Sequence, residues 1–364
     1  MEGSTKKKRI RDYGISPGRL QTGAGNRITD VEGVRVGHCT IHHGQNHTGV
    51  TVIMPGEENQ FLNPCVAAAY VHNGFGKSAG LVQVQELGTL ETPVALTNTL
   101  SVGSVWDALT GYMIERCEQD GVTLTSVNPV VGECNDSRIN RIQNRVVGEE
   151  HVRSAIAAAS KIFEEGAVGA GTGTICHGLK GGIGTASRVI QIGNREYTVG
   201  ALVQSNYGAT EDFTLFGKPL GQQILAWKQE KDDMAASEQD KGSIMTVLAT
   251  DLPLSSRQLY RVIRRAGVGI SRTGAYMGHG SGEVMIGFTT ANRLPRRGGE
   301  EPLCLQILPE EQLNKAFLAA AEAVWEAILN SMVCAERVRG LEGELYYSLA
   351  EILPELWENE GVRN

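Results

Sequence analysis

The chain has 364 residues, of which 41% are hydrophobic and 21% are charged, a composition that excludes a disordered chain and predicts a sizeable hydrophobic core. A net charge of −7 and a pI near 5.7 argue against a general nucleic-acid binder. No run approaches the roughly 18 apolar residues of a membrane span, and seven scattered cysteines without a CxxC spacing predict reduced, buried thiols in a cytoplasmic protein.

The first part of the chain combines short predicted strands with two predicted helices. Ser104 is a predicted N-cap for a helix that runs to about Cys117. A second helix is predicted from residue 150 to residue 165, where Gly166 stops it. Alternating or continuous apolar residues predict three strands, at residues 34–36, 51–54 and 65–71.

Glycine is concentrated in the middle of the chain, where tight turns are expected. Residues 166–184 are too glycine-rich for a helix and are predicted to be turns that lead into strands. Residues 187–192 and 197–204 are predicted to form a hairpin around Gly193-Asn194. A short helix is predicted over residues 220–227.

A charged segment without hydrophobic periodicity, residues 228–241, predicts a mobile surface loop. The run 244–250 follows abruptly and is apolar on both faces, as expected of a central strand. Ser255 and Gln258 form a capping box that begins another helix. The remaining predicted elements are a strand at 284–289 and the longest helix, opened by Pro309. This mixed order favours an α+β layered sandwich over a doubly wound sheet.

Two apparent ligand motifs fail on closer inspection. Gly76-Lys77-Ser78 resembles the end of a phosphate-binding loop, but the first glycine of that motif falls on Val71. Histidines and a cysteine gather between residues 38 and 47, yet Gly44 predicts a hairpin turn rather than the helix that would bring His43 and His47 together on a metal.

The junction between Gly242 and Ser243 has the features of a self-cleavage site. A predicted loop ends there, and a buried strand follows. Glycine at 242 leaves its carbonyl carbon uncrowded for attack by a serine hydroxyl. A released α-amine, with a pKa of about 7.7–8.0, can take part in proton transfer near neutral pH. The same pattern also describes an ordinary loop-to-strand junction.

Several motifs together resemble the L-aminopeptidase/D-esterase-amidase family, which includes the β-peptidyl aminopeptidases. The resemblance covers nearly the whole chain from residue 26. Its motifs are NRITDV at 26–31, GVRVGH at 33–38, GAGTGT at 169–174, GGIGT at 181–185, GSIM at 242–245, LATD at 248–251 and GHGSGE at 278–283.

The resemblance implies a four-layer αββα sandwich of the N-terminal-nucleophile-hydrolase type and no metal or organic cofactor. It also implies self-cleavage into chains 1–242 and 243–364, which stay folded together and assemble as a homo-oligomer. Expected substrates are small peptides, amino-acid amides or esters, with no nucleic-acid or membrane partner.

Carried over position by position, the resemblance makes Ser243 the nucleophile. Ser281 and Glu283 match the residues that assist its proton transfers. Asn206 matches the side-chain donor of the oxyanion hole, and Glu133 matches the carboxylate that receives the substrate ammonium. The proton acceptor is left open between the α-amine of Ser243 and Glu283 acting through Ser281.

One departure from the family lies after Glu133, where some members place a tyrosine and this chain has Cys134 and Asn135. Asn135 is therefore a candidate substrate-binding residue in its place. Two other functions are compatible with parts of this pattern. An ornithine-acetyltransferase-like enzyme would use threonine rather than Ser243 at the cleavage point. A binding protein that kept the fold without the chemistry would leave the chain intact.

Overall fold

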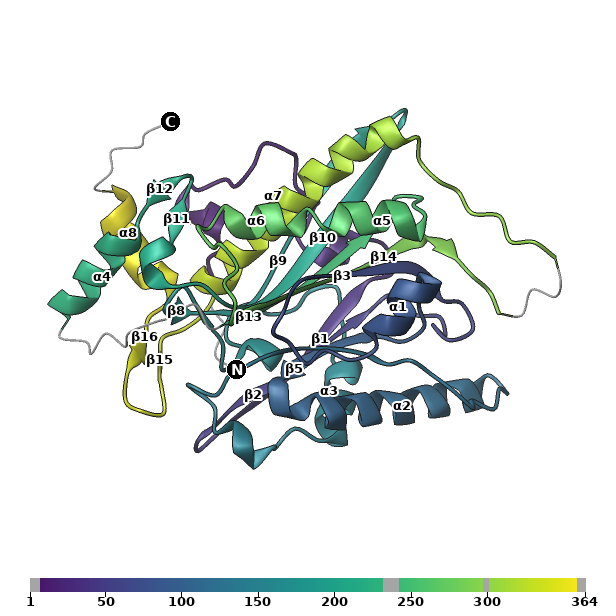
Figure 1. The fold of residues 1–364 in the computed structure, drawn as a ribbon, viewed down its shortest axis with the longest axis horizontal. Coiled ribbons are helices and arrows are strands. Elements are labelled where there is room, and N and C mark those ends of the chain that lie inside the picture. The colour runs from purple at the N-terminus through teal and green to yellow at the C-terminus, as the bar shows by residue number, and fades with distance from the viewer. Residues whose placement is uncertain (1–6, 232–241, 297–300, 359–364) are drawn as a thin grey trace.

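Two β-sheets packed face to face form the centre of the computed structural model, which describes residues 7–231, 242–296 and 301–358. Helices cover the outer face of each sheet (Figure 1). Apolar side chains from both sheets, such as Leu96, Val130, Met245 and Val284, fill the space between them. The predicted αββα layering is thus observed.

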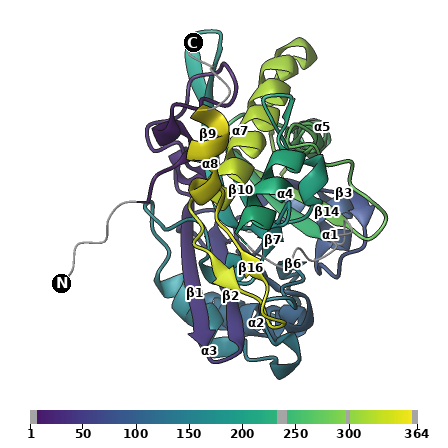
Figure 2. The same cartoon turned by 90° about the vertical axis from the view of Figure 1, so that its left-hand side faces the viewer.

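The smaller sheet carries helices on its outer face. Val52 and Ala95 of this sheet pack there against Leu109 and Val152 of the helices. Figure 2 shows these helices, α2 and α3, at the lower end of the molecule next to β1 and β2. In order across the sheet the strands are β1 (Arg35–His43), β2 (Asn46–Met54), β5 (Val94–Asn98) and β6 (Val130–Cys134), and the helices are α2 (Val102–Gln119) and α3 (Glu149–Ala157).

The larger sheet has six strands and packs against the C-terminal helices. Its strands, in order, are β4 (Thr89–Leu90), β3 (Cys65–Gly74), β14 (Gly282–Arg293), β13 (Ser243–Thr250), β10 (Arg195–Asn206) and β9 (Gly182–Ile192). The covering helices are α5 (Ser256–Ile263), α6 (Ala266–Ser271) and α7 (Leu313–Val333).

Shorter elements surround the two sheets. They are the helices α1 (Leu81–Leu87), α4 (Gly221–Glu230) and α8 (Leu349–Glu358), and the two-stranded pairs β7 (Ile175–Cys176) with β8 (Leu179–Lys180), β11 (Thr214–Leu215) with β12 (Lys218–Pro219), and β15 (Val338–Arg339) with β16 (Leu345–Tyr346).

Strand β13 confirms the central strand predicted from its apolar sequence. Ile244 and Leu248 face the helices, whereas Met245 and Val247 face the other sheet. It lies between β10, which is antiparallel to it, and β14, which is parallel. The capping box is also confirmed, because the Ser255 hydroxyl accepts the Gln258 N–H at 3.2 Å.

Two predicted helix boundaries are wrong. Helix α3 ends at Ala157 rather than at residue 165, because the backbone of Ser160 pairs in both directions with Val36 of β1. Helix α2 begins at Val102, before the predicted cap Ser104, because a 3-10 turn capped by the Asn98 side chain leads directly into it. Of the predicted loop 228–241, residues 228–230 end helix α4, and residues 232–241 lie outside the described residues.

Helix α7 and the turn before it are long and apolar enough to span a membrane by composition, contrary to the expectation that no such segment exists. However, 89% of the most apolar window in residues 310–333 is buried inside the molecule. Its apolar side chains pack against β9 and β10, so α7 is the core helix of the larger sheet.

The cysteines only partly match the prediction of buried thiols. All seven lie within the described residues and are free, but Cys304 is exposed and Cys39 is half-buried.

Candidate active site

Ser243 is the first residue of β13, and the pairing of that strand brings three chain segments together around it. On one side Ser243 pairs with Asn206, the last residue of β10, and on the other side it pairs with Gly282, the first residue of β14. Ser243 is 5% exposed. Two predicted site segments, which are distant in sequence, therefore meet at the predicted cleavage point.

Gly242 has no room for a side chain. A Cβ atom at this position would lie 1.9 Å from the carbonyl oxygen of Asn206. The carbonyl oxygen of Gly242 accepts a hydrogen bond from the backbone N–H of Gly282 at 3.1 Å. A donor is thus already aimed at the oxygen that would become negatively charged if Ser243 attacked this carbonyl.

Ser281 and Glu283 flank Gly282 and are linked to each other. The Ser281 hydroxyl donates a hydrogen bond to Oε1 of Glu283, and both side chains are fully buried. The two side chains therefore lie on the same side of the segment. A contact of either side chain with the Ser243 hydroxyl stays a prediction.

The Asn206 side chain is oriented by the hairpin formed by β7 and β8. Its Oδ1 accepts the backbone N–H of Ile175 at 3.0 Å. Because this bond uses the amide oxygen, the NH2 end of Asn206 is the end available as a donor to another group. Asn206 is 6% exposed, so a bond that it made to a developing charge would be little screened by water.

Glu133 lies on β6 and is 3% exposed, so it is not a solvated surface glutamate. Its Oε1 accepts the backbone N–H of Lys77 at 2.8 Å, and its Oε2 accepts the hydroxyl of Thr99. The segment of Phe75 and Lys77, which binds Glu133, also packs against Gly282 beside the predicted cleavage point, because a Cβ on Gly282 would lie 2.6 Å from the carbonyl oxygen of Phe75.

Asn135 is exposed, and its Oδ1 accepts the backbone N–H of Ser137 at 3.0 Å. This local turn explains the conformation of Asn135. Its role in substrate binding stays a prediction.

Two further groups lie beside the predicted nucleophile, Ser243. Sγ of Cys134 is 3.5 Å from the carbonyl oxygen of Ser243, and burial raises the pKa of this thiol, which is therefore a neutral donor. The second group is the backbone N–H of Gly282. Neither gave a signal in the sequence, because a lone cysteine has no pattern and a backbone donor leaves no side chain to recognise.

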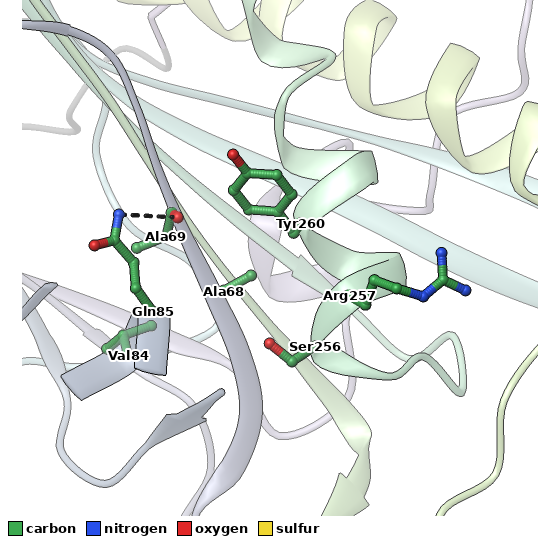
Figure 3. Close-up of a pocket in the computed structure, with 7 residues that line it drawn as sticks. All are labelled: Ala68, Ala69, Val84, Gln85, Ser256, Arg257 and Tyr260. Carbon is green, nitrogen blue, oxygen red and sulfur yellow. Dashed lines mark hydrogen bonds between the residues drawn. The ribbon is translucent and has the colours of Figure 1, made fainter. Parts of the chain in front are cut away.

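The cavity shown in Figure 3 lies away from this cluster. It has a volume of about 430 Å³ and is lined by residues of β3, α1 and α5, including Ala68, Gln85 and Tyr260. Ala68 pairs with Gly287, five residues along β14 from Gly282. None of the predicted site residues lines it.

The histidines near residue 40 lie on the predicted hairpin. His42 pairs with His47 across the turn at Gly44, and their Nδ1 atoms are 3.2 Å apart. In the part of the chain that the structure describes, no group of three or more His, Cys, Asp or Glu side chains is placed to hold a metal ion.

The sequence model of peptidase family S58 matches residues 26–346, which is most of the chain. The chain belongs to peptidase family S58. It is 36% identical, over 358 residues, to beta-peptidyl aminopeptidase BapA of Sphingosinicella xenopeptidilytica, covering 94% of this chain and 88% of that protein.

Solved structures agree with this assignment. A Burkholderia sp. beta-aminopeptidase superposes with a TM-score of 0.88 and 39% identity, covering 98% of this chain and all of that one. The L-aminopeptidase D-Ala-esterase/amidase of Ochrobactrum anthropi superposes with a TM-score of 0.89 and 36% identity, covering 98% of this chain and 99% of that one. That protein is described as a prototype of the serine aminopeptidases and as a variant of the Ntn hydrolase fold. This S58 chain is therefore a serine aminopeptidase of the Ntn type, and the acetyltransferase alternative is not supported.

Proposed function

We propose that this S58 peptidase cleaves its own Gly242–Ser243 bond and then uses Ser243 to release N-terminal residues from small peptides, amides and esters. The observation that carries this proposal is the hydrogen bond from Gly282 N–H to the carbonyl oxygen of Gly242, with Ser243 next in the chain. It holds the bond to be broken in the place where an oxyanion would be stabilised.

Self-cleavage begins when Oγ of Ser243 attacks the carbonyl carbon of Gly242. The C–N bond breaks, the nitrogen of Ser243 leaves as an amine, and an ester joins the two residues. Water then hydrolyses the ester and leaves a carboxylate on Gly242 and a free hydroxyl on Ser243. In the uncleaved chain the nitrogen of Ser243 belongs to an amide, so it is too weakly basic to take the hydroxyl proton at the start. The hydrogen-bonded pair Ser281 and Glu283 is then the relay, which takes the proton from the Ser243 hydroxyl and delivers it to that nitrogen as the C–N bond breaks.

Turnover reuses the same groups. The acyl group of the substrate takes the place vacated by Gly242, so its oxygen meets the N–H of Gly282, and the NH2 of Asn206 is the second donor. The α-amine of Ser243, with a pKa of about 7.7–8.0, joins Glu283 as a proton acceptor. Buried Glu133 receives the substrate's ammonium, which restricts the enzyme to substrates with a free N-terminus.

The names of the relatives mention β-peptides, L-amino acids and D-alanine esters and amides. We therefore expect substrates of these classes, and p-nitroanilides of L-, D- and β-amino acids would rank them. We also propose that cleaved units assemble as a homo-oligomer in the cytoplasm, which gel filtration with light scattering would test for assembly.

The first test is intact-mass spectrometry of purified protein, with wild type beside Ser243→Ala. Wild type should give two fragments that meet at Gly242/Ser243, whereas the variant should give one full-length mass. Hydrolysis of an amino-acid p-nitroanilide should appear only in the cleaved protein. A single full-length mass in both samples would refute self-processing.

A further inference from the structure

Lys180, at the end of β8, is a fully buried cation beside the oxyanion machinery. Its Nζ donates to three backbone carbonyl oxygens, those of Gly171 at 3.0 Å, Thr174 at 2.8 Å and Gly181 at 2.8 Å. An ammonium group has three N–H donors, and each of these three carbonyls takes one of them. The geometry therefore matches the charged form of Lys180.

One of these carbonyls belongs to the peptide unit that orients Asn206. The carbonyl oxygen of Thr174 accepts from Lys180, and the N–H of the same peptide, on Ile175, donates to Oδ1 of Asn206 at 3.0 Å. Lys180 is also the cross-strand partner of Ile175 in the hairpin of β7 and β8. A continuous chain of hydrogen bonds thus runs from the ammonium to the carboxamide.

We propose that Lys180 is a positioning residue for the reaction, which polarises the Asn206 carboxamide toward the oxyanion through the Thr174–Ile175 peptide. This inference rests on the proposed role of Asn206. A cation at the carbonyl end of a peptide makes its N–H a stronger donor, and a stronger bond to Oδ1 makes the Asn206 NH2 more positive in turn. Because Lys180, Thr174 and Asn206 are buried, water screens these hydrogen bonds little.

The charge on Lys180 is balanced by its surroundings. Burial lowers the pKa of Lys180 to about 7, and the carboxylate of Asp136 opposes this effect. Asp136 is itself buried after β6, and burial raises its pKa to about 7. Burial raises the pKa of nearby Cys176 to about 12, so its thiol is neutral, whereas the charge of Lys7 opposes the ammonium. Burial also lowers the pKa of His47, and the charges of His42 and Lys180 act in the same direction.

A buried lysine also stabilises its own loop, so the test needs a matched control. Lys228 provides one, because it is buried and its Nζ donates to the carbonyl oxygen of Gly178 at 2.6 Å, in the turn of the same hairpin. Lys228→Met removes a buried ammonium from the hairpin without touching the peptide bonded to Asn206. Lys180→Met removes the ammonium that is hydrogen-bonded to that peptide.

The experiment compares kcat and KM of wild type, K180M and K228M on one amino-acid p-nitroanilide, with the cleaved fraction of each measured by intact mass. We expect K180M to lower kcat per cleaved enzyme about 10-fold with KM nearly unchanged, below the roughly 10²–10³-fold cost of losing an oxyanion donor outright. K228M should keep wild-type kcat. Equal kcat in the two variants would overturn the inference. An uncleaved, inactive wild type would instead overturn the proposed function.

The Asp136→Asn variant keeps the test decisive if K180M does not fold. The carboxamide can still accept the bond that Asn140 donates to Asp136 Oδ1 at 2.9 Å. If the Lys180 charge supports the reaction, kcat should decrease as rising pH removes the proton from Lys180. Without the Asp136 carboxylate the pKa of Lys180 should fall, so this decrease should begin at a pH lower by about one unit. A pH profile of kcat identical to that of wild type would contradict a role for the Lys180 charge.

Discussion

The backbone N–H of Gly282 donates to the carbonyl oxygen of Gly242 at 3.1 Å, at the start of the parallel pairing between β14 and β13. This is an ordinary sheet hydrogen bond in its geometry. Its position is unusual, because the carbonyl it holds precedes the predicted nucleophile. A sheet contact that stabilises the fold before cleavage is thereby in place to stabilise the transition state of cleavage.

Replacing Gly242 by alanine should block maturation. The new Cβ would lie 1.9 Å from the carbonyl oxygen of Asn206, so the chain must move away from the position where Gly282 donates. We expect cleavage to slow by at least about 100-fold, the cost of losing one oxyanion donor. The measurement is a time course of intact mass during cell-free synthesis, in which every chain starts uncleaved. Gly103→Ala, in open space on helix α2, is the control and should mature at the wild-type rate.

Glu283→Gln should separate proton transfer from binding. The amide oxygen can still accept from the Ser281 hydroxyl, but the side chain cannot take up a proton. We expect self-cleavage to slow by roughly 10²–10⁴-fold, the usual contribution of a general base. The exposed Glu118→Gln on helix α2 controls for loss of charge. Cleavage of E283Q at the wild-type rate would assign the relay to another group.

Glu133→Gln should weaken the enzyme's requirement for a free N-terminus. The carboxamide oxygen of the variant can keep the bond from the Lys77 N–H, so the loop is preserved while the negative charge is lost. A hydrogen bond to a charged group contributes about 1.5–3 kcal/mol, so KM for an amino-acid p-nitroanilide should rise roughly 10- to 100-fold. The check is the ratio of kcat/KM between free and N-acetylated substrates. That ratio should fall in the variant and would stay constant if another group binds the ammonium.

Glu326→Gln should destabilise the fold in a pH-dependent way. Glu326 is fully buried on α7, where Arg188 contacts its Oε2 at 2.7 Å and Arg11 contacts its Oε1 at 2.7 Å. Burial alone would raise its pKa, but the hydrogen bond from Arg11 and the charge of Arg188 outweigh burial and lower the pKa below its usual 4.5. The stabilisation from ionised Glu326 is therefore present above about pH 4.5 and is lost as the pH falls through the lower, folded-state value.

Urea unfolding of E326Q, in a Ser243→Ala background that keeps one chain, should show a loss of about 3–5 kcal/mol near pH 7. The loss should shrink toward pH 4 and below. Glu310→Gln is the surface control, because its ion pairs with Arg257 and Arg261 are exposed. A change below about 1 kcal/mol is expected there. A pH-independent loss in E326Q would show that the packing of Glu326, and not its charge, stabilises α7.

Local sequence signals were sufficient for part of this structure. The two-sided apolar run 244–250 indicated a central strand, and the spacing of Ser255 and Gln258 indicated a helix start. The predicted end of α3 was wrong, because the pairing of Ser160 with Val36 overrides the local helical pattern. Such long-range pairings are not encoded in a short window of sequence.

The candidate site shows the same division. Ser243, Asn206 and the segment 281–283 were identified from motifs, and the structure brings them together at the ends of neighbouring strands. The donors that orient them could not be identified in this way. The N–H groups of Gly282 and Ile175 belong to the backbone, and Lys180 acts across a hairpin whose register the sequence does not reveal.

The position of β13 between β10 and β14 has a consequence for how the enzyme survives unfolding. β10 belongs to the chain that would end at Gly242, and β13 and β14 belong to the chain that would begin at Ser243. Before the proposed cleavage the sheet would fold in a unimolecular step; afterwards the same ladder would join two molecules, so refolding would become second order and its yield would depend on protein concentration. The proposed cleavage would thus fix the order of events in biosynthesis: the sheet would have to form first, and an enzyme that later lost it would regain it far less readily.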